Sequence, residues 1–260
     1  MTERTNSASM RVLAIGNSFS QNAATYLHDI AAASGTDLFI TNLYIGGCSL
    51  ETHWDNAEHD APNYERQENG VFTGQMVSIR QTLESGDWDV ITMQQASHFS
   101  GMRETYYPYL PRLAAFVRNL CPASRLMIHE TWAYETGFDG LSRYHDSQSE
   151  MYSLLKEAYE EAARKAVSGQ ILSLIPSGDA FQLARENPLY QTRFDDGREV
   201  KLNCDGYHAT VYGKYLLGAV WFEALIGHPM ADNPFVPEGA DPNRIPFLKE
   251  CAHRAVAARR

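Results

Sequence analysis

The chain has 260 residues, of which 44% are hydrophobic and 21% charged, and its 32 acidic and 22 basic side chains give a formal net charge of −10 at pH 7. A length of this order suits a single α/β domain that can bury most of its apolar surface. The negative charge and the lack of a Lys/Arg run argue against a nucleic-acid partner, because phosphates require cationic contacts. They also make an acidic polymer a poor substrate, unless the site itself is basic.

Apolar runs that alternate with helical segments give the predicted elements in chain order. Strands are expected at 11–15, 38–44, 89–94, 125–129 and 170–175, and helices at 23–34, 105–120, 147–168 and 212–226. This alternation predicts a parallel sheet with helices on both faces, whose ligands bind at the carboxyl ends of the strands. Residues 10–260 are expected to form one domain, with a flexible segment at 1–9. A proline-rich wrap from about residue 227 is expected to end in a short helix.

Segments that target or anchor a protein are not evident. No apolar stretch reaches the ~18 residues of a membrane span, and residues 1–10 are too polar and too short for a signal peptide. We expect a cytoplasmic protein, or a periplasmic or secreted one if a leader has been removed. The four cysteines contain no Cys-x-x-Cys pair, which favours reduced thiols. Cys48 and Cys204, which the fold would bring together, are either two packed thiols or a disulfide.

The first predicted strand ends at a glycine, a short amide and a serine, in Gly16-Asn17-Ser18-Phe19-Ser20. A helical segment follows, so Ser18 is expected near a helix N-terminus, where unpaired backbone N–H groups favour negative charge. The Ser18 hydroxyl is then either a capping or anion-binding group, or a nucleophile with its oxyanion held by its own N–H. The local sequence is compatible with both.

A base for such a nucleophile is available near the other end of the chain. Asp205 and His208 are three residues apart, a spacing that fits a tight turn. Asp205 can accept from the Nδ1–H of His208 and leave Nε2 free to face a serine, as in a Ser-His-Asp triad. The same pattern fits a loop-to-helix turn capped by Asp205, so these residues alone leave two interpretations.

Four blocks in order resemble those of the SGNH (GDSL-type) hydrolases: Gly16-Asn17-Ser18-Phe19-Ser20, Gly46-Gly47, Gln94-Gln95-Ala96-Ser97 and Asp205-x-x-His208. The first block is also similar to the Gly-Gln-Ser-Asn opening of carbohydrate acetylesterases. The resemblance implies a three-layer α/β/α, flavodoxin-like fold with a five-stranded parallel sheet. It also implies a Ser18, His208 and Asp205 triad that uses no metal or other cofactor.

The resemblance places an oxyanion hole at the N–H groups of Ser18 and Gly47 and at a side-chain amide of the third block. The commonest third block supplies an asparagine, which residues 93–98 lack. Gln95 is the expected donor, and Gln94 is the second choice because the strand register is uncertain by one residue.

Two long polar connections, 51–75 and 176–203, are expected to border the site, since loops of this length are usually functional or mobile. Trp132 and Tyr134 follow the fourth predicted strand at the same edge. The aromatic side chains of this edge either bind a sugar ring or pack the loops onto the body. The expected substrate rim consists of Asn17, His53, Trp54, His98, Trp132 and Tyr207.

The leading expectation is therefore a serine esterase that removes a small acyl group, most simply acetyl, from a small molecule or oligosaccharide. A lipase or thioesterase with the same machinery is an alternative, and so is a catalytically silent binding protein with this fold. A metal-dependent hydrolase built on His53, Asp55, His59 and Asp60 is a more remote alternative, because such residues in a polar loop are more often solvated.

Overall fold

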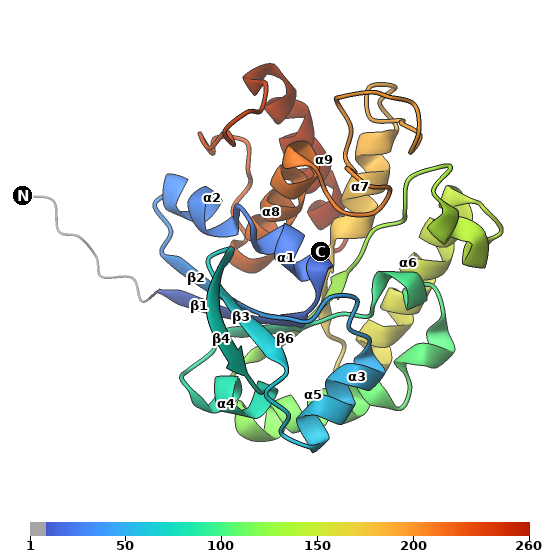
Figure 1. Ribbon diagram of the computed structural model, residues 1–260. Coiled ribbons are helices and arrows are strands. Elements are labelled where there is room, and N and C mark those ends of the chain that lie inside the picture. The colour runs from blue at the N-terminus through green and yellow to red at the C-terminus, as the bar shows by residue number, and fades with distance from the viewer. Residues whose placement is uncertain (1–8) are drawn as a thin grey trace, which may run out of the picture.

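A central sheet of seven strands organises the computed structural model, which describes residues 9–260. The segment expected to be flexible therefore lies, up to residue 8, outside the described residues. The strand order across the sheet is β4-β3-β2-β1-β5-β6-β7 (Figure 1). The strands are β1 (Met10–Gly16), β2 (Leu38–Tyr44), β3 (Tyr64–Glu68), β4 (Val71–Val77), β5 (Val90–Met93), β6 (Arg125–Glu130) and β7 (Ser173–Pro176).

The five predicted strands are confirmed as the parallel part of the sheet. β1 pairs in parallel with β2 and β5, and β6 pairs in parallel with β5 and β7. Val12 to Ile15 are completely buried because helices cover both faces, which explains the continuous apolar run. The expected number of five strands is wrong, since β3 and β4 form an antiparallel hairpin on β2.

Helices lie on both faces of the sheet, as predicted. Figure 1 shows α1, α2, α8 and α9 on one side and α3, α4 and α5 on the other. The predicted helix at 23–34 divides into two, and α3, α4 and α7 were not predicted. The helices are α1 (Ser18–Ala24), α2 (Leu27–Ala33), α3 (Leu50–Glu58), α4 (Ile79–Glu84), α5 (Tyr109–Leu120), α6 (Gln148–Lys165), α7 (Ser177–Arg185), α8 (Val211–Ile226) and α9 (Ile245–Ala257).

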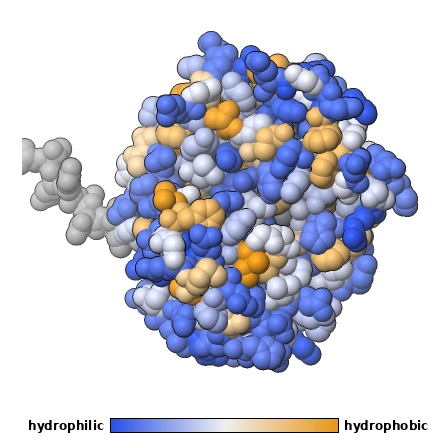
Figure 2. Space-filling view, in the orientation of Figure 1, coloured by the Kyte–Doolittle hydropathy of each residue, from blue (hydrophilic) through white to orange (hydrophobic). Residues whose placement is uncertain are grey.

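The core is continuous from the strands to α8, which is buried around most of its circumference. The segment after α8 leads to α9, which packs on α7 and α8. Hydrophilic side chains cover most of the face in Figure 2, with hydrophobic ones scattered among them. Within residues 9–260, no helix combines the length and the apolar composition that a bilayer crossing requires.

Candidate active site

Ser18 is the first residue of α1 and follows β1 by two residues. Asn17 caps the helix, since its Oδ1 accepts a hydrogen bond from the Phe19 N–H at 2.9 Å. The Oγ of Ser20 accepts from the Asn17 N–H at 3.0 Å and closes the turn. A Cβ on Gly16 would collide with that hydroxyl, so the turn requires glycine at this position. The turn holds Ser18 half-buried at the carboxyl end of a central strand.

Asp205 and His208 form a hydrogen-bonded pair in the loop before α8. Asp205 Oδ2 accepts from His208 Nδ1 at 2.7 Å, and Asp205 Oδ1 accepts from the backbone N–H groups of Tyr207 and His208 at 3.2 and 2.8 Å. Burial works to raise the pKa of Asp205, but these hydrogen bonds outweigh it and hold the pKa below its usual range. The carboxylate thus both caps the turn and orients the imidazole, so the two interpretations of this motif are compatible.

The N-terminal turn and the histidine loop are tied together by direct contacts. Asn22 of α1 accepts a hydrogen bond at Oδ1 from the Ala209 N–H at 2.7 Å. Phe19 stacks on Trp132 with ring centroids 4.0 Å apart, and Trp132 Nε1 donates to the Tyr207 carbonyl at 2.8 Å. The helix that carries Ser18 therefore also positions the loop that carries His208.

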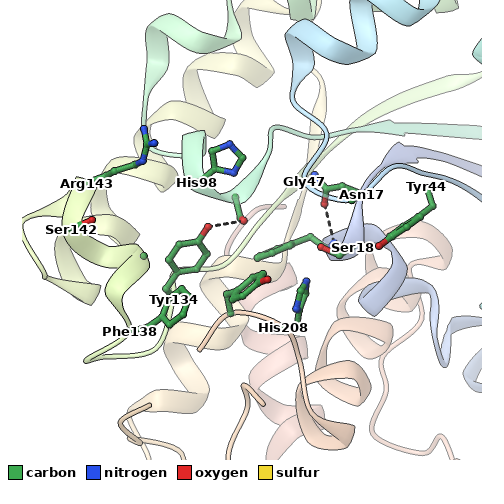
Figure 3. A pocket seen from close by; sticks show the side chains of 15 residues that line it. Asn17, Ser18, Tyr44, Gly47, His98, Tyr134, Phe138, Ser142, Arg143 and His208 are labelled. Atoms are coloured by element: carbon green, nitrogen blue, oxygen red, sulfur yellow. Dashed lines mark hydrogen bonds between the residues drawn. The ribbon is translucent and has the colours of Figure 1, made fainter. Parts of the chain in front are cut away.

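Ser18 and His208 line one cavity of about 520 Å³ (Figure 3). No hydrogen bond joins the Ser18 hydroxyl to the His208 ring in this structure, and such bonds commonly tighten only when substrate binds. The cavity is lined by Asn17, Ser18, Phe19, Tyr44, Gly46, Gly47, Ser97, His98, Tyr134, Phe138, Gly140, Ser142, Arg143, Tyr207 and His208.

Gly47 lies beside Ser18 in a tight turn after β2. Its φ of +64° is in the left-handed region that favours glycine, and the Cys48 N–H closes the turn on the Ile45 carbonyl at 3.2 Å. The Asn17 amide donates to the Cys48 carbonyl at 3.0 Å and fixes this turn to the Ser18 turn.

The structure does not bring the two glutamine amides to the cavity. Gln95 was the expected oxyanion donor, but its Nε2 donates to Thr105, and its Oε1 accepts from the Leu50 and Ala96 N–H groups. Gln94, the second choice, donates from Nε2 to Asn17 Oδ1 at 2.8 Å and is buried. Gln94 therefore supports the Ser18 turn from behind, whereas Gln95 fastens α3 to the segment before α5.

The cavity contains three of the six residues expected at the substrate rim. Asn17, His98 and Tyr207 line the cavity, whereas three other predicted rim residues do not: His53, Trp54 and Trp132. His53 is buried against Tyr64, 2.8 Å from its hydroxyl, and burial lowers its pKa to about 3. Trp54 packs against the core under Arg112, and Trp132 is buried between Phe19 and Phe181.

The connections 51–75 and 176–203 supply no cavity residue, contrary to expectation. The first holds α3 and the edge hairpin, and the second begins with α7. That wall comes instead from residues 134–143, which lead into the 3-10 helix η3 (Asp139–Tyr144), and of these only Tyr134 was expected at this edge. The same signal, a position directly after the predicted strand at 125–129, could have located the rest of this segment.

The thiols and the acidic residues form no further centre in the part of the chain that the structure describes. All four cysteines are free, so Cys48 and Cys204 are not paired. Burial raises the pKa of Cys48 to about 12, and its Sγ lies 3.4 Å from His53 Nδ1. Within residues 9–260, no three His, Cys, Asp or Glu side chains are grouped so that they could hold a metal ion.

Comparison with solved structures identifies the class of fold. A candidate SGNH hydrolase from Slackia heliotrinireducens is 23% identical, with a TM-score of 0.54 over 83% of this chain and 98% of that one. A carbohydrate esterase family 3 protein from Talaromyces cellulolyticus is 8% identical, with a TM-score of 0.51 over 84% and 97%. The chain therefore has the SGNH-hydrolase fold, as the four sequence blocks indicated.

The family is defined more narrowly by a profile and by one solved relative. The DUF4886 profile, described as a domain of unknown function, matches residues 11–255. A DUF4886 family protein from Bacteroides uniformis is 37% identical, with a TM-score of 0.87 over 96% of this chain and 95% of that one. No curated protein matches. The chain belongs to the DUF4886 family.

Proposed function

We propose that this protein is a serine esterase of the SGNH type that hydrolyses a small acyl ester, most simply an acetyl ester, on a carbohydrate. The observation that carries the proposal is that Ser18 and His208 line one cavity although they come from opposite ends of the chain. Asp205 holds the His208 ring through its hydrogen bond to Nδ1. One structural neighbour is named as a carbohydrate esterase, which motivates the choice of a carbohydrate ester.

In the proposed acylation step, His208 Nε2 removes the proton from Ser18 Oγ as this oxygen attacks the ester carbonyl carbon. The Oγ–C bond forms, and the electron pair of the carbonyl moves onto its oxygen. The N–H groups of Ser18 and Gly47 stabilise that oxyanion. When the tetrahedral intermediate collapses, the C–O bond to the sugar breaks, and the leaving alcohol takes the proton from His208.

Water then releases the acyl group in the second half of the reaction. His208 removes a proton from a water molecule, whose oxygen attacks the acyl-enzyme carbonyl, and the intermediate expels Ser18 Oγ, which recovers the proton. Asp205 keeps the proton of the imidazole on Nδ1 throughout and stabilises the imidazolium that forms in each half.

The cavity favours a compact polar substrate over a long acyl chain. Its aromatic residues include Tyr44, Tyr134, Phe138 and Tyr207, which offer faces to the C–H surface of a sugar ring. A cavity of about 520 Å³ has the size of a small-ligand site. These features support a sugar ester rather than the lipase or thioesterase alternative.

The test compares Ser18→Ala with the parent protein on p-nitrophenyl acetate. We expect a loss of roughly 10³-fold or more in kcat/KM with an unchanged circular dichroism spectrum, and loss of fluorophosphonate labelling. Ser149→Ala, at an exposed serine of α6, is the matched control and should retain both. Rates should also fall as the p-nitrophenyl acyl chain lengthens from acetate to decanoate. A Ser18→Ala variant as active as the parent would reject the proposal.

A further inference from the structure

The cavity beside Ser18 is basic although the protein is acidic. Acidic residues outnumber basic ones by 32 to 22 in the whole chain. The 15 cavity residues nevertheless include Arg143 and two histidines, His98 and His208, and contain no Asp or Glu. The lining that the structure describes therefore carries one permanent positive charge, that of Arg143, and no carboxylate of its own, while Asp205 lies behind His208. This is the condition under which an anionic substrate remains acceptable.

Arg143 carries a permanent positive charge and is the only arginine or lysine among the described residues that line this cavity. It lies in η3, and no carboxylate of the described residues is within salt-bridge distance of its guanidinium. Its guanidinium carbon lies 5.6 Å from the centre of the Phe99 ring, a cation–π contact that restrains the side chain without neutralising it. An arginine that lines a cavity without a protein counter-ion can bind a negative group of a ligand.

We infer that Arg143 binds a carboxylate of the substrate, so that the natural substrate is an acylated sugar acid. The inference rests on the proposed function for the identity of the ester, but the carboxylate site itself does not require hydrolysis. The planar guanidinium fork matches the two oxygens of a carboxylate.

The charge of the site favours one negative charge over two. His98 lines the cavity beside Arg143, and burial together with the neighbouring guanidinium lowers its pKa. A neutral His98 can take part in a hydrogen bond with the ligand but adds no positive charge near pH 7. A single arginine then balances a carboxylate, whereas a phosphate dianion would keep an uncompensated charge.

The positions of the residues suit a sugar that spans the cavity. In Figure 3, Arg143 and His98 lie across the cavity from Ser18, with Tyr134 and Phe138 along its side. Phe138 stacks on Tyr207 with ring centroids 5.4 Å apart, which gives a continuous aromatic surface. A sugar ring on this surface would present its ester to Ser18 and its acid group to Arg143.

Binding of non-hydrolysable ligands tests the inference without relying on catalysis. The parent protein is titrated, with calorimetry or ligand-observed NMR, with the methyl glycosides of galacturonic acid, galactose and galactose 6-phosphate. We expect the galacturonoside to bind about tenfold tighter than the galactoside, as expected for one charge-assisted contact at an exposed site. Arg143→Gln should remove this preference and leave the affinity for the galactoside within about twofold.

Controls separate the cavity arginine from general electrostatics. Arg164→Gln removes the same charge from an exposed position of α6 outside the cavity and should keep the preference. Equal binding of the acid and the neutral sugar, no binding of either, or tighter binding of the phosphate would overturn the inference.

Hydrolysis of the acetylated galacturonoside and galactoside is measured in parallel. Equal turnover of both esters would contradict the sugar-acid assignment and leave the esterase proposal standing. Arg143-dependent binding of the galacturonoside without turnover of either ester would support the carboxylate site and contradict the esterase proposal.

Discussion

Replacing Asn22 with alanine is expected to reduce activity more than it reduces stability. Asn22 lies one helical turn after Ser18, is 6% exposed, and accepts a hydrogen bond from the backbone N–H next to His208 at 2.7 Å. Its hydrogen bond therefore links the helix that carries the proposed nucleophile directly to the loop that carries the proposed base. Without it, the Ala209 N–H stays buried with no acceptor.

The magnitude follows from the two opposing effects of the substitution. A buried N–H that loses its acceptor costs about 1–3 kcal/mol. Alanine is the better helix former by about 0.6 kcal/mol, which offsets part of that loss. The free energy of unfolding should therefore fall by about 1–2 kcal/mol, which corresponds to a Tm decrease of roughly 2–8 °C for a protein of this size. Because a displacement of about 1 Å in a catalytic group can cost ~10²-fold in rate, kcat should fall ~10- to 100-fold.

Kinetics at a temperature well below both melting transitions separate these effects. The expected signature is a lower kcat for p-nitrophenyl acetate with a KM that changes much less, because Asn22 lies outside the cavity. Asn56→Ala is a matched control, since Asn56 is 4% exposed but belongs to α3, away from the loop. It should lose stability and keep its kcat. An Asn22→Ala variant with parental kcat would refute the idea that α1 positions His208.

Two further predictions concern buried charges. Arg259→Met should lower the free energy of unfolding, measured by urea denaturation, by about 3–5 kcal/mol. Arg259 pairs with buried Glu130 at 3.2 Å and with Asp179 at 2.8 Å, so Glu130 would lose its counter-ion and Asp179 would keep only Lys156, at 3.2 Å. A loss under about 1 kcal/mol would contradict this. Burial lowers the pKa of His129 to about 3. Below about pH 6.5 only the unfolded chain therefore takes up this proton, and the free energy of unfolding decreases by about 1.4 kcal/mol for each unit by which the pH falls. His129→Gln should remove this contribution between about pH 6 and 4, whereas His228→Asn, at an exposed site, should not; equal slopes would argue against a neutral buried His129.

The parallel strands were predictable because burial on both faces leaves a continuous apolar run in the sequence. The edge hairpin was not, because six of the seven residues of β4 are exposed and their pattern resembles that of a loop. Its turn nevertheless carries a recognisable signal. Asn69 and Gly70 have positive φ values of 47° and 82°, the conformation for which Asn-Gly is the preferred pair between hairpin strands.

The site was predictable where a motif fixes its own geometry. Asp205 and His208 are close in sequence, and the capped turn alone brings carboxylate and imidazole together. Gln95 was misplaced because β5 ends at Met93, so strand alternation no longer governs the direction of its side chain. His53 and Trp54 were misplaced because they lie in α3, which the polar composition of its segment conceals.

Net charge leads to an expectation about partners but does not describe the cavity. A protein with ten excess negative charges repels polyanions over distances comparable to the Debye length, about 8 Å at physiological ionic strength. Among the described residues that line the cavity, Arg143 is the only arginine or lysine, and no Asp or Glu competes with it. The two effects act at different ranges, so together they favour a small, singly charged sugar acid over an acidic polysaccharide. Raising the salt concentration should therefore weaken galacturonoside binding while leaving galactoside binding unchanged.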